Sequence, residues 1–374
     1  MNDLSGSTSR RIVVKVGSSV IAPGLAVSED RLASIARQIS MLIEAGHRVT
    51  LVTSGAIAAG LAGLSLDAMP EAIIERQTAA AVGQTKLMNA WAHAFTSRTI
   101  AQVLLTEDDL DHRERFLNAR RTIESLQHHG VVPILNENDS VSFEEIRLGD
   151  NDRLSAIAAA SLGADLLIVL SVAPGLLDEE GRLIGEVRQT EDVREHVRDD
   201  TSASGTGGMH TKLDAASIAL AHSFEMVIAS GEEPDVVTRV VSGEAVGTRF
   251  IPDRRQPLAA RKSWIGLAAK TRGRLVVDEG ARAALVDQGA SLLPKGIAQV
   301  KGEFVRGSVV EIASQDGEVF ARGIVSYATA DVLAIKGQQT SGIAVSLGYH
   351  YADEVVHRDD LLILTPQLAR TLRR

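Results

Sequence analysis

The run that decides the fold class is Val13-Val14-Lys15-Val16-Gly17-Ser18-Ser19, close to the start of the chain. Its valines are typical of a strand that is buried on both faces, because β-branched side chains pack well on a pleated surface. Gly17 then frees the backbone for a tight turn and for close approach to a ligand. The run therefore predicts a buried strand that ends in a glycine loop and carries one lysine.

Beyond this run, residues up to about 250 alternate short apolar segments with longer amphipathic ones. The predicted strands are 12–16, 49–52, 101–105, 131–135, 166–170 and 225–228. The predicted helices are 29–44, 71–95, 113–128, 152–162 and 212–223. Apolar strands between helices indicate an α/β fold, a parallel-rich αβα sandwich, in which ligands bind at the carboxyl ends of the strands. Gly17, Ser54 and Asn136 fall at such ends.

From Gly273 onward the pattern changes to short strands separated by turn residues. The predicted strands here are 275–277, 298–301, 309–312, 319–325 and 332–335. Asp316-Gly317 is typical of a hairpin turn. This part of the chain is therefore expected to form a small β-rich barrel.

Length and composition limit the classes of protein to consider. The chain has 374 residues, which suggests two domains, and 45% of them are hydrophobic. It has no cysteine, which excludes disulfides, thiolate metal sites and a cysteine nucleophile. The polar N-terminus and the lack of a membrane-length apolar run predict a soluble, cytoplasmic protein without membrane contact. The net charge is −9, yet residues 254–274 hold seven basic and no acidic side chains.

A second glycine-rich loop precedes a helical pattern further along the chain, Gly205-Thr206-Gly207-Gly208-Met209-His210-Thr211-Lys212. Backbone N–H groups at a helix start bind anions, and Lys212 adds a charge, although the spacing is not that of a Walker A loop. Alone, this loop could be a plain turn, just as Lys15 could lie on an edge strand. Together, two glycine loops with two lysines favour a phosphate site.

Three further polar segments each admit two interpretations. Ser54 could bind a carboxylate or phosphate, or cap the following helix. Asn136-Glu137-Asn138-Asp139 could bind a ligand or form Asx turns. Asp150 or Asn151 could cap a helix, with Asp152 in its first turn, where it could orient basic side chains or help to hold a metal ion. No histidine has a partner at metal-ligand spacing, so no zinc site is expected.

This inventory of lysines, glycine loops and carboxylates favours phosphoryl transfer, in which catalysis is mostly positioning and charge neutralisation. No general base stands out in the sequence, so the nucleophile of the substrate would already be charged.

These segments resemble the amino acid kinase family over nearly the whole chain. The segments that carry the resemblance are 13–18, 52–57, 104–106, 115–120, 133–139, 149–155 and 205–212. Residues 293–297 and 323–327 resemble a PUA domain, which many bacterial members carry. We therefore predict an amino acid kinase catalytic domain at 1–253, a basic linker at 254–274, and a PUA-like domain with a C-terminal tail at 275–374.

The resemblance implies ATP-dependent phosphorylation of the γ-carboxylate of L-glutamate, the first step of proline biosynthesis. Lys15 and Lys212 would neutralise the transferring phosphoryl group, and Asp152 would hold both lysines. The substrate-binding residues would be Ser54, Asp139 and Asn151. The nucleotide-binding residues would be Lys15, Gly17, Ser171, Val172, Thr206, Gly207, Gly208, Met209, His210, Thr211 and Lys212. The resemblance also implies Mg²⁺ held largely by ATP and water, feedback inhibition by proline, and a homo-oligomer, either dimer or tetramer.

One departure from the family pattern follows the predicted strand 166–170. The family usually has Thr-Asp or Ser-Asp there and then a Gly-Leu-Tyr turn, whereas this chain has Ser171-Val172 and Gly175-Leu176-Leu177. The change removes a polar contact and an aromatic surface near the nucleotide, which leaves nucleotide affinity and base preference open.

Two alternatives remain open. A kinase of the same fold could act on carbamate, aspartate, acetylglutamate or UMP, although residues 136–139 and the PUA-like tail argue against it. A hypothesis from another class is an RNA-binding protein that acts through the PUA-like domain and the basic linker.

Overall fold

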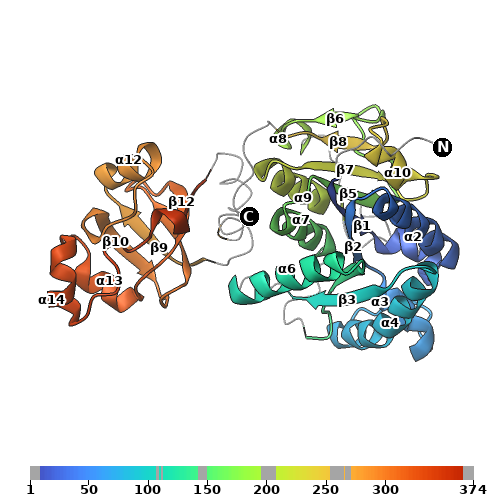
Figure 1. The fold of residues 1–374 in the computed structure, drawn as a ribbon, viewed down its shortest axis with the longest axis horizontal. Helices are drawn as coiled ribbons and strands as arrows, with labels where there is room; N and C mark the ends of the chain where they lie inside the picture. The colour runs from blue at the N-terminus through green and yellow to red at the C-terminus, as the bar shows by residue number, and fades with distance from the viewer. Residues whose placement is uncertain are drawn as a thin grey trace. The chain divides into compact units, whose positions relative to one another are not determined.

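The structure, a computed structural model, describes residues 9–106, 109–110, 113–141, 150–194, 208–252, 265 and 271–364. These residues form two compact units, the first from residues within 1–257 and the second chiefly from residues within 258–374 (Figure 1). The predicted boundary between 253 and 254 lies among residues outside the described ranges, and the one between 274 and 275 falls within the strand Thr271–Val277; the domain limits stay predictions. Among the described residues, no helix has both the length and the apolar character that crossing a bilayer requires.

The first unit contains an eight-stranded sheet in the order β3-β4-β2-β1-β5-β7-β8-β6. The strands are β1 Arg11–Val16, β2 Arg48–Thr53, β3 Ile100–Leu105, β4 Val132–Glu137, β5 Leu166–Ser171, β6 Glu186–Val187, β7 Glu225–Ser230 and β8 Thr248–Phe250. The neighbours from β3 to β7 are all parallel, β7 and β8 are antiparallel, and β8 and β6 are parallel. The predicted parallel-rich sheet is therefore confirmed.

Helices cover both faces of this sheet, so the predicted αβα sandwich is also confirmed (Figure 1). One face carries α2 Glu29–Glu44, α3 Ala56–Leu61, α4 Ile73–Ala94 and α10 Val236–Val241. The other face carries α6 Arg113–His128, α7 Asp150–Leu162 and α9 Met209–Ala221. The short helices α1 Ser18–Ile21 and α8 Glu191–Arg194 lie between these elements in the chain.

Strand β1 sits between β2 and β5, with Lys15 opposite Val52 on one side and Val169 on the other. The interpretation of Lys15 as an edge-strand lysine is therefore wrong. Side chains alternate along a strand, and Ile12, Val14 and Val16 belong to the core under the helices of the α2 face. Lys15 consequently points to the opposite face, which α7 and α9 cover.

Several predicted element boundaries differ from the structure in ways that matter for the site. Strand β4 continues through Asn136 and Glu137, which are both buried, so these two residues are not part of a turn. Helix α7 begins at Asp150 rather than Asp152, and α9 begins at Met209 rather than Lys212. Residues predicted to lie in loops thus belong to regular elements, which hold their side chains in fixed directions.

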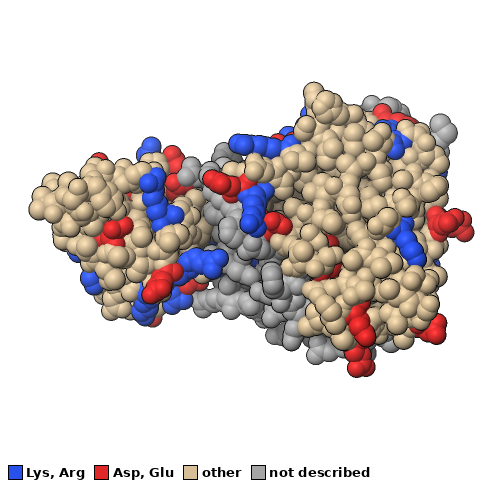
Figure 2. Space-filling model, turned by 90° about the horizontal axis from the view of Figure 1, so that it is seen from below, with Lys and Arg blue, Asp and Glu red and all other residues tan. Residues whose placement is uncertain are grey.

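The second unit is a five-stranded sheet in the order β10-β9-β11-β12-β13 with helices beside it. Its elements are β9 Thr271–Val277, α12 Glu279–Asp287, β10 Ile297–Gly302, β11 Val309–Ala313, β12 Val319–Ile324, α13 Thr329–Ile335, α14 Ile343–Leu347 and β13 Leu361–Ile363. The predicted hairpin is confirmed, since β11 and β12 are antiparallel and Gly317 has a φ of 91°. On the face that Figure 2 shows, basic and acidic side chains of the described residues are interspersed, without a continuous patch of either sign.

The predicted strand 332–335 is wrong, because these residues end helix α13. Val332 and Ile335 are buried while Leu333, between them, is 48% exposed. Burial of residues three apart is the period of a helix, not of a strand. Four consecutive residues, Val332 to Ile335, are too short a run for the sequence to distinguish the two periods.

Helices α3 and α4 cross at two glycines. A Cβ atom on Gly83 of α4 would overlap the carbonyl oxygen of Ala56, and one on Gly60 of α3 would overlap that of Ala79. Only glycine permits backbones to approach this closely. The crossing fixes α4 against α3, which starts directly after Ser54 and Gly55.

We expect Gly83→Ala to lower the free energy of unfolding of the first unit by about 1–3 kcal/mol or more, because the added methyl group has no space between the two backbones. Differential scanning calorimetry would measure the loss. Gly280→Ala in α12 is the matched control, because its Cβ would lie at an ordinary distance of 3.4 Å from the nearest atom, Asp278 Oδ1. Equal transition temperatures for Gly83→Ala and the unmodified chain would contradict the close crossing.

Candidate active site

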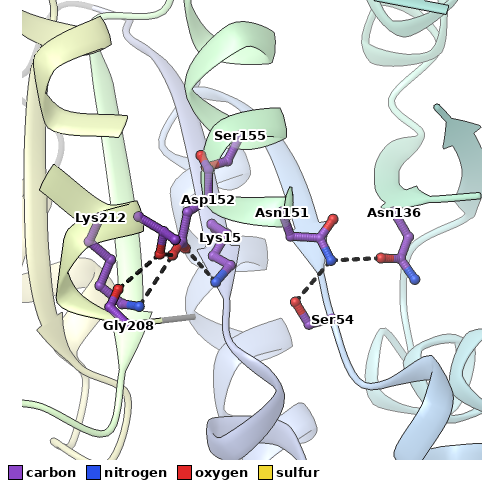
Figure 3. Close-up of polar contacts among 9 residues, drawn as sticks. Lys15, Ser54, Asn136, Asn151, Asp152, Ser155, Gly208 and Lys212 are labelled. Carbon is purple, nitrogen blue, oxygen red and sulfur yellow. Dashed lines mark hydrogen bonds and ion pairs between the residues drawn. The ribbon is translucent and has the colours of Figure 1, made fainter. Parts of the chain in front are cut away.

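A buried carboxylate lies between two lysines at the carboxyl edge of the sheet. Asp152 Oδ1 is 2.5 Å from Lys15 Nζ, and Asp152 Oδ2 is 3.2 Å from Lys212 Nζ (Figure 3). Thr211 Oγ1 donates a hydrogen bond of 2.7 Å to the same Oδ2. Asp152 is 0% exposed and each lysine is 5% exposed. The structure thus brings the three predicted catalytic residues together from β1, α7 and α9.

The charges of this cluster depend on one another. Burial alone would raise the pKa of the Asp152 carboxyl, but Lys15 and Lys212 outweigh that effect and, with the Thr211 hydrogen bond, hold the pKa at about 2. Burial lowers the pKa of the Lys212 ammonium, Asp152 opposes this shift, and the nearby charge of Lys15 adds to it. Two cations against one anion leave the cluster with a net positive charge, which suits an anionic ligand.

The first turn of α9 lies beside the cluster. Gly208 is the N-cap, and its carbonyl oxygen lies 2.8 Å from Thr211 Oγ1, so it shares the single hydroxyl hydrogen of Thr211 with Asp152 Oδ2. Met209, His210, Thr211 and Lys212 form the first helical turn, whose backbone N–H groups make a helix start attractive to anions. Thr206 and Gly207, also predicted to bind nucleotide, lie outside the described residues.

A group of amide and hydroxyl side chains lies on the other side of α7. Asn151 Nδ2 donates hydrogen bonds to Ser54 Oγ at 3.0 Å and to Asn136 Oδ1 at 3.1 Å. The proposed capping roles of Ser54 and Asn151 are wrong, because the N-cap of α3 is Gly55 and Asn151 lies inside α7, which begins at Asp150. Two predicted substrate-binding residues, Ser54 and Asn151, are therefore in direct contact.

The first turn of α7 joins the two groups. Asn151 and Asp152 are consecutive, so their side chains leave the helix about 100° apart. Figure 3 shows Asn151 directed toward Ser54 and Asn136, and Asp152 directed toward Lys15 and Lys212. Ser155 Oγ donates a hydrogen bond of 2.7 Å to the Asp152 carbonyl oxygen and is fully buried. We call the Lys15–Asp152–Lys212 cluster the cationic half of the site and the group of Ser54, Asn136 and Asn151 the amide half. The first turn of α7 sets the spacing between these two halves.

Asp139, the third predicted substrate-binding residue, follows β4. Its carboxylate makes no hydrogen bond or ion pair with the part of the chain that the structure describes, so it is not brought into contact with Ser54 or Asn151. Burial raises the pKa of Asp139 to about 6. A half-buried carboxylate without a partner among the described residues is costly unless a cation joins it.

The remaining predicted nucleotide-binding residues line the ends of β1 and β5. The Gly17 N–H donates to the Leu170 carbonyl oxygen at 3.1 Å, and a Cβ at Gly17 would approach that oxygen to 3.3 Å. Ser171 ends β5, and the Val172 side chain that follows is 43% exposed. The position of the unusual Val172 is therefore an apolar surface at the carboxyl edge.

Among the described residues, no group of three or more His, Asp or Glu side chains could hold a metal ion. Asp152, the carboxylate closest to the predicted phosphate site, uses both oxygens for Lys15, Lys212 and Thr211. The donor set thus suits a metal ion that arrives bound to nucleotide phosphates rather than one held by protein carboxylates.

The sequence did not single out Gln84, in the middle of α4. Gln84 Oε1 accepts a hydrogen bond of 2.8 Å from Asn136 Nδ2, which connects α4 to the amide half of the site. The one feature of the sequence that pointed to this part of α4 was the preceding Gly83, since a glycine inside a helical pattern indicates close approach of another backbone.

Two family models match the sequence. The family model described as "Amino acid kinase family" matches residues 10–230, and the model described as "PUA domain" matches residues 273–345. The chain belongs to the amino acid kinase family. The second unit accordingly carries a PUA domain, whose matched residues include strands β10, β11 and β12 of its antiparallel-rich sheet.

Curated members of the family are similar to this chain over nearly their whole length. A protein of Syntrophotalea carbinolica named "Glutamate 5-kinase" is 45% identical over 95% of this chain and 97% of its own length. Another of that name, from Shewanella pealeana, is 45% identical over 95% of this chain and 98% of its own. A solved carbamate kinase from Giardia has a TM-score of 0.48 and 16% identity, covering 66% of this chain and 100% of that one.

We expect Asp152→Asn to lower the free energy of unfolding by about 3–5 kcal/mol, because it leaves two buried lysines without a counter-charge. Urea unfolding at neutral pH would measure this loss. Asp178→Asn is the matched control, since Asp178 pairs with Arg182 on the surface and such pairs contribute about 0–1 kcal/mol. Comparable losses in the two variants would contradict the central role of Asp152.

Proposed function

We propose that the chain catalyses ATP-dependent phosphorylation of the γ-carboxylate of L-glutamate, giving L-glutamyl 5-phosphate and ADP. The observation that carries the proposal is the buried Asp152 between Lys15 and Lys212, in the same helical turn as Asn151, which contacts Ser54. The curated relatives named "Glutamate 5-kinase" support the choice of glutamate as acceptor.

Lys15 and Lys212 would neutralise the charge that spreads over the transferring phosphoryl group, while Asp152 holds both ammonium groups in place. The first turn of α9, Gly208 to Lys212, would lie along the ATP phosphates, with Gly17 and Ser171 at the ends of the neighbouring strands. Thr206, Gly207 and Val172 would complete the nucleotide site. Bound Mg²⁺ would supply further charge neutralisation, and ATP and water would provide most of its ligands.

Ser54, Asn151 and Asp139 would bind glutamate. The carboxylate of Asp139 has the sign to pair with the substrate ammonium, which would supply the counter-charge that no described residue gives it. The γ-carboxylate is itself an anionic nucleophile, so it can attack the γ-phosphorus without losing a proton. This agrees with the lack of a histidine or carboxylate placed as a general base among the described residues of the cluster.

Three finer features complete the proposal. Proline would compete at or near the glutamate site, and the chain would form a homo-oligomer. The PUA domain would act in regulation or assembly. RNA binding through that domain is the second candidate, and it depends on the match at residues 273–345 and on the basic residues of 254–274.

The proposal is tested by incubating the purified chain with ATP, Mg²⁺, hydroxylamine and a panel of acids, since hydroxylamine traps an acyl phosphate as a hydroxamate. We expect hydroxamate with L-glutamate and not with aspartate, acetylglutamate or carbamate, and suppression by proline. Lys212→Ala should lower kcat by about 10²–10³-fold, because one charge is lost at the transferring group. Lys86→Ala, an exposed lysine of the same unit, should leave kcat unchanged.

Hydroxamate from several acids at similar rates, or equal activity of Lys212→Ala and Lys86→Ala, would refute the proposal. ATP hydrolysis that requires no added carboxylic acid would also refute the proposal.

The raised pKa of Asp139 predicts a pH dependence for glutamate binding. Above about pH 6 the carboxylate is charged and can hold the ammonium, and below that pH it is neutral. We therefore expect the KM for L-glutamate to rise about 10-fold between pH 7.5 and pH 5, while the KM for ATP changes little. ADP quantified by chromatography at each pH would show this.

Asp139→Asn should have a high KM for L-glutamate that no longer varies with pH over this range. A wild-type KM for L-glutamate that stays constant from pH 7.5 to pH 5 would show that Asp139 does not bind the ammonium.

A further inference from the structure

The amide group of the site has a fixed hydrogen-bond direction, set by the backbone. The Glu137 N–H donates to Asn136 Oδ1 at 3.0 Å. A backbone N–H can only donate, so the atom of the Asn136 amide that faces it must be the oxygen. The Asn136 NH₂ group therefore points the other way, toward Gln84 Oε1 at 2.8 Å.

The same direction continues to Ser54. Asn136 Oδ1 also faces the amide of Asn151, which must present its NH₂ group at 3.1 Å. The second hydrogen of that NH₂ group goes to Ser54 Oγ at 3.0 Å (Figure 3). Ser54 Oγ is therefore an acceptor toward Asn151, and its own hydroxyl hydrogen has no acceptor among the described residues.

We propose that Gln84 is a positioning residue that acts through Asn136 and Asn151 to make Ser54 a hydrogen-bond donor toward a carboxylate of the substrate. The inference rests on the proposed glutamate kinase function and adds α4 to the site. It assigns the Ser54 hydroxyl to an acceptor group of the ligand rather than to its ammonium. We call the set Gln84, Asn136, Asn151 and Ser54 the amide relay.

The surroundings of Gln84 agree with this role. Its only hydrogen bond with the described chain is to Asn136, and its Nε2 atom is buried without a partner. An unpaired buried donor is a net cost to folding, and such costs are typical of functional sites. Gly83, directly before Gln84, fixes the distance of α4 from the segment that follows Ser54 through the close α3–α4 crossing.

A purely structural role makes a different prediction from a positioning role. If Gln84 only stabilised the fold, its loss would lower the unfolding temperature and affect ATP and glutamate alike. If it holds the Asn136 amide in place against the Glu137 N–H, its loss would act on glutamate and would depend on whether Ser54 is present. Gln84 and Ser54 do not touch, so energetic coupling between them has to pass through Asn136 and Asn151.

The test is a double-mutant cycle of Gln84→Leu and Ser54→Ala, with hydroxamate formation and ADP release as readouts. We expect Gln84→Leu to raise the KM for L-glutamate about 10-fold, with the KM for ATP within about 2-fold and kcat within about 3-fold. Ser54→Ala should raise the KM for L-glutamate about 10-fold in the wild type, but only about 2-fold in the Gln84→Leu background.

Two variants serve as controls. Gln84→Glu keeps an acceptor for the Asn136 NH₂ group and should bind L-glutamate within about 3-fold of the wild type. Asn89→Leu removes an amide from the exposed face of the same helix and should change nothing. If Gln84→Leu does not fold, Gln84→Met, which keeps the length of the side chain without the amide, takes its place in the cycle.

Additive effects of Gln84→Leu and Ser54→Ala on the KM for L-glutamate would overturn the inference. So would an equal rise of both KM values together with a lower unfolding temperature, since that is the structural outcome. A wild-type chain that gives no hydroxamate from L-glutamate would refute the proposed function itself, which the cycle presupposes.

Discussion

The site depends on one constraint: a buried carboxylate must keep two buried lysines charged. Asp152 is inaccessible to solvent, and its two oxygens are divided between Lys15 and Lys212. The three residues come from β1, α7 and α9, so the ion pairs hold only if both helices pack on the same face of the sheet. One anion against two cations also leaves a net positive charge, which a phosphate group would complete.

The second half of the site is tied to the first through the start of α7. Asn151 precedes Asp152, and its amide reaches Ser54 and Asn136 at the ends of neighbouring strands. The strand order β4-β2-β1-β5 sets out Asn136, Ser54, Lys15 and Ser171 along one edge of the sheet. A substrate carboxylate and a nucleotide phosphate could thus meet across a single turn of helix, which is what transfer between them requires.

Much of this arrangement could be predicted from the sequence, and the exceptions have physical causes. Helices α2 and α6 were predicted with the bounds they have, because long amphipathic repeats fix the period. The strand before Asn136 was predicted to end at Leu135, because an asparagine next to a glutamate is rare in a buried strand, yet the amide relay satisfies Asn136 there. Gln84 carried no signal of its own beside the preceding Gly83, since a single glutamine in a long helix shows its role only when tertiary contacts bring it to Asn136.

The most direct test of phosphoryl transfer to a carboxylate is to follow the carboxylate oxygen. L-Glutamate labelled with ¹⁸O in the γ-carboxylate would be incubated with the full chain, ATP, Mg²⁺ and hydroxylamine, and the released phosphate analysed by mass spectrometry. If the carboxylate attacks the γ-phosphorus, the phosphate that hydroxylamine releases carries one ¹⁸O atom, because that oxygen had bridged carbon and phosphorus. Phosphate that contains no ¹⁸O would mean that water received the phosphoryl group, and would contradict the assignment of the site to a carboxylate kinase.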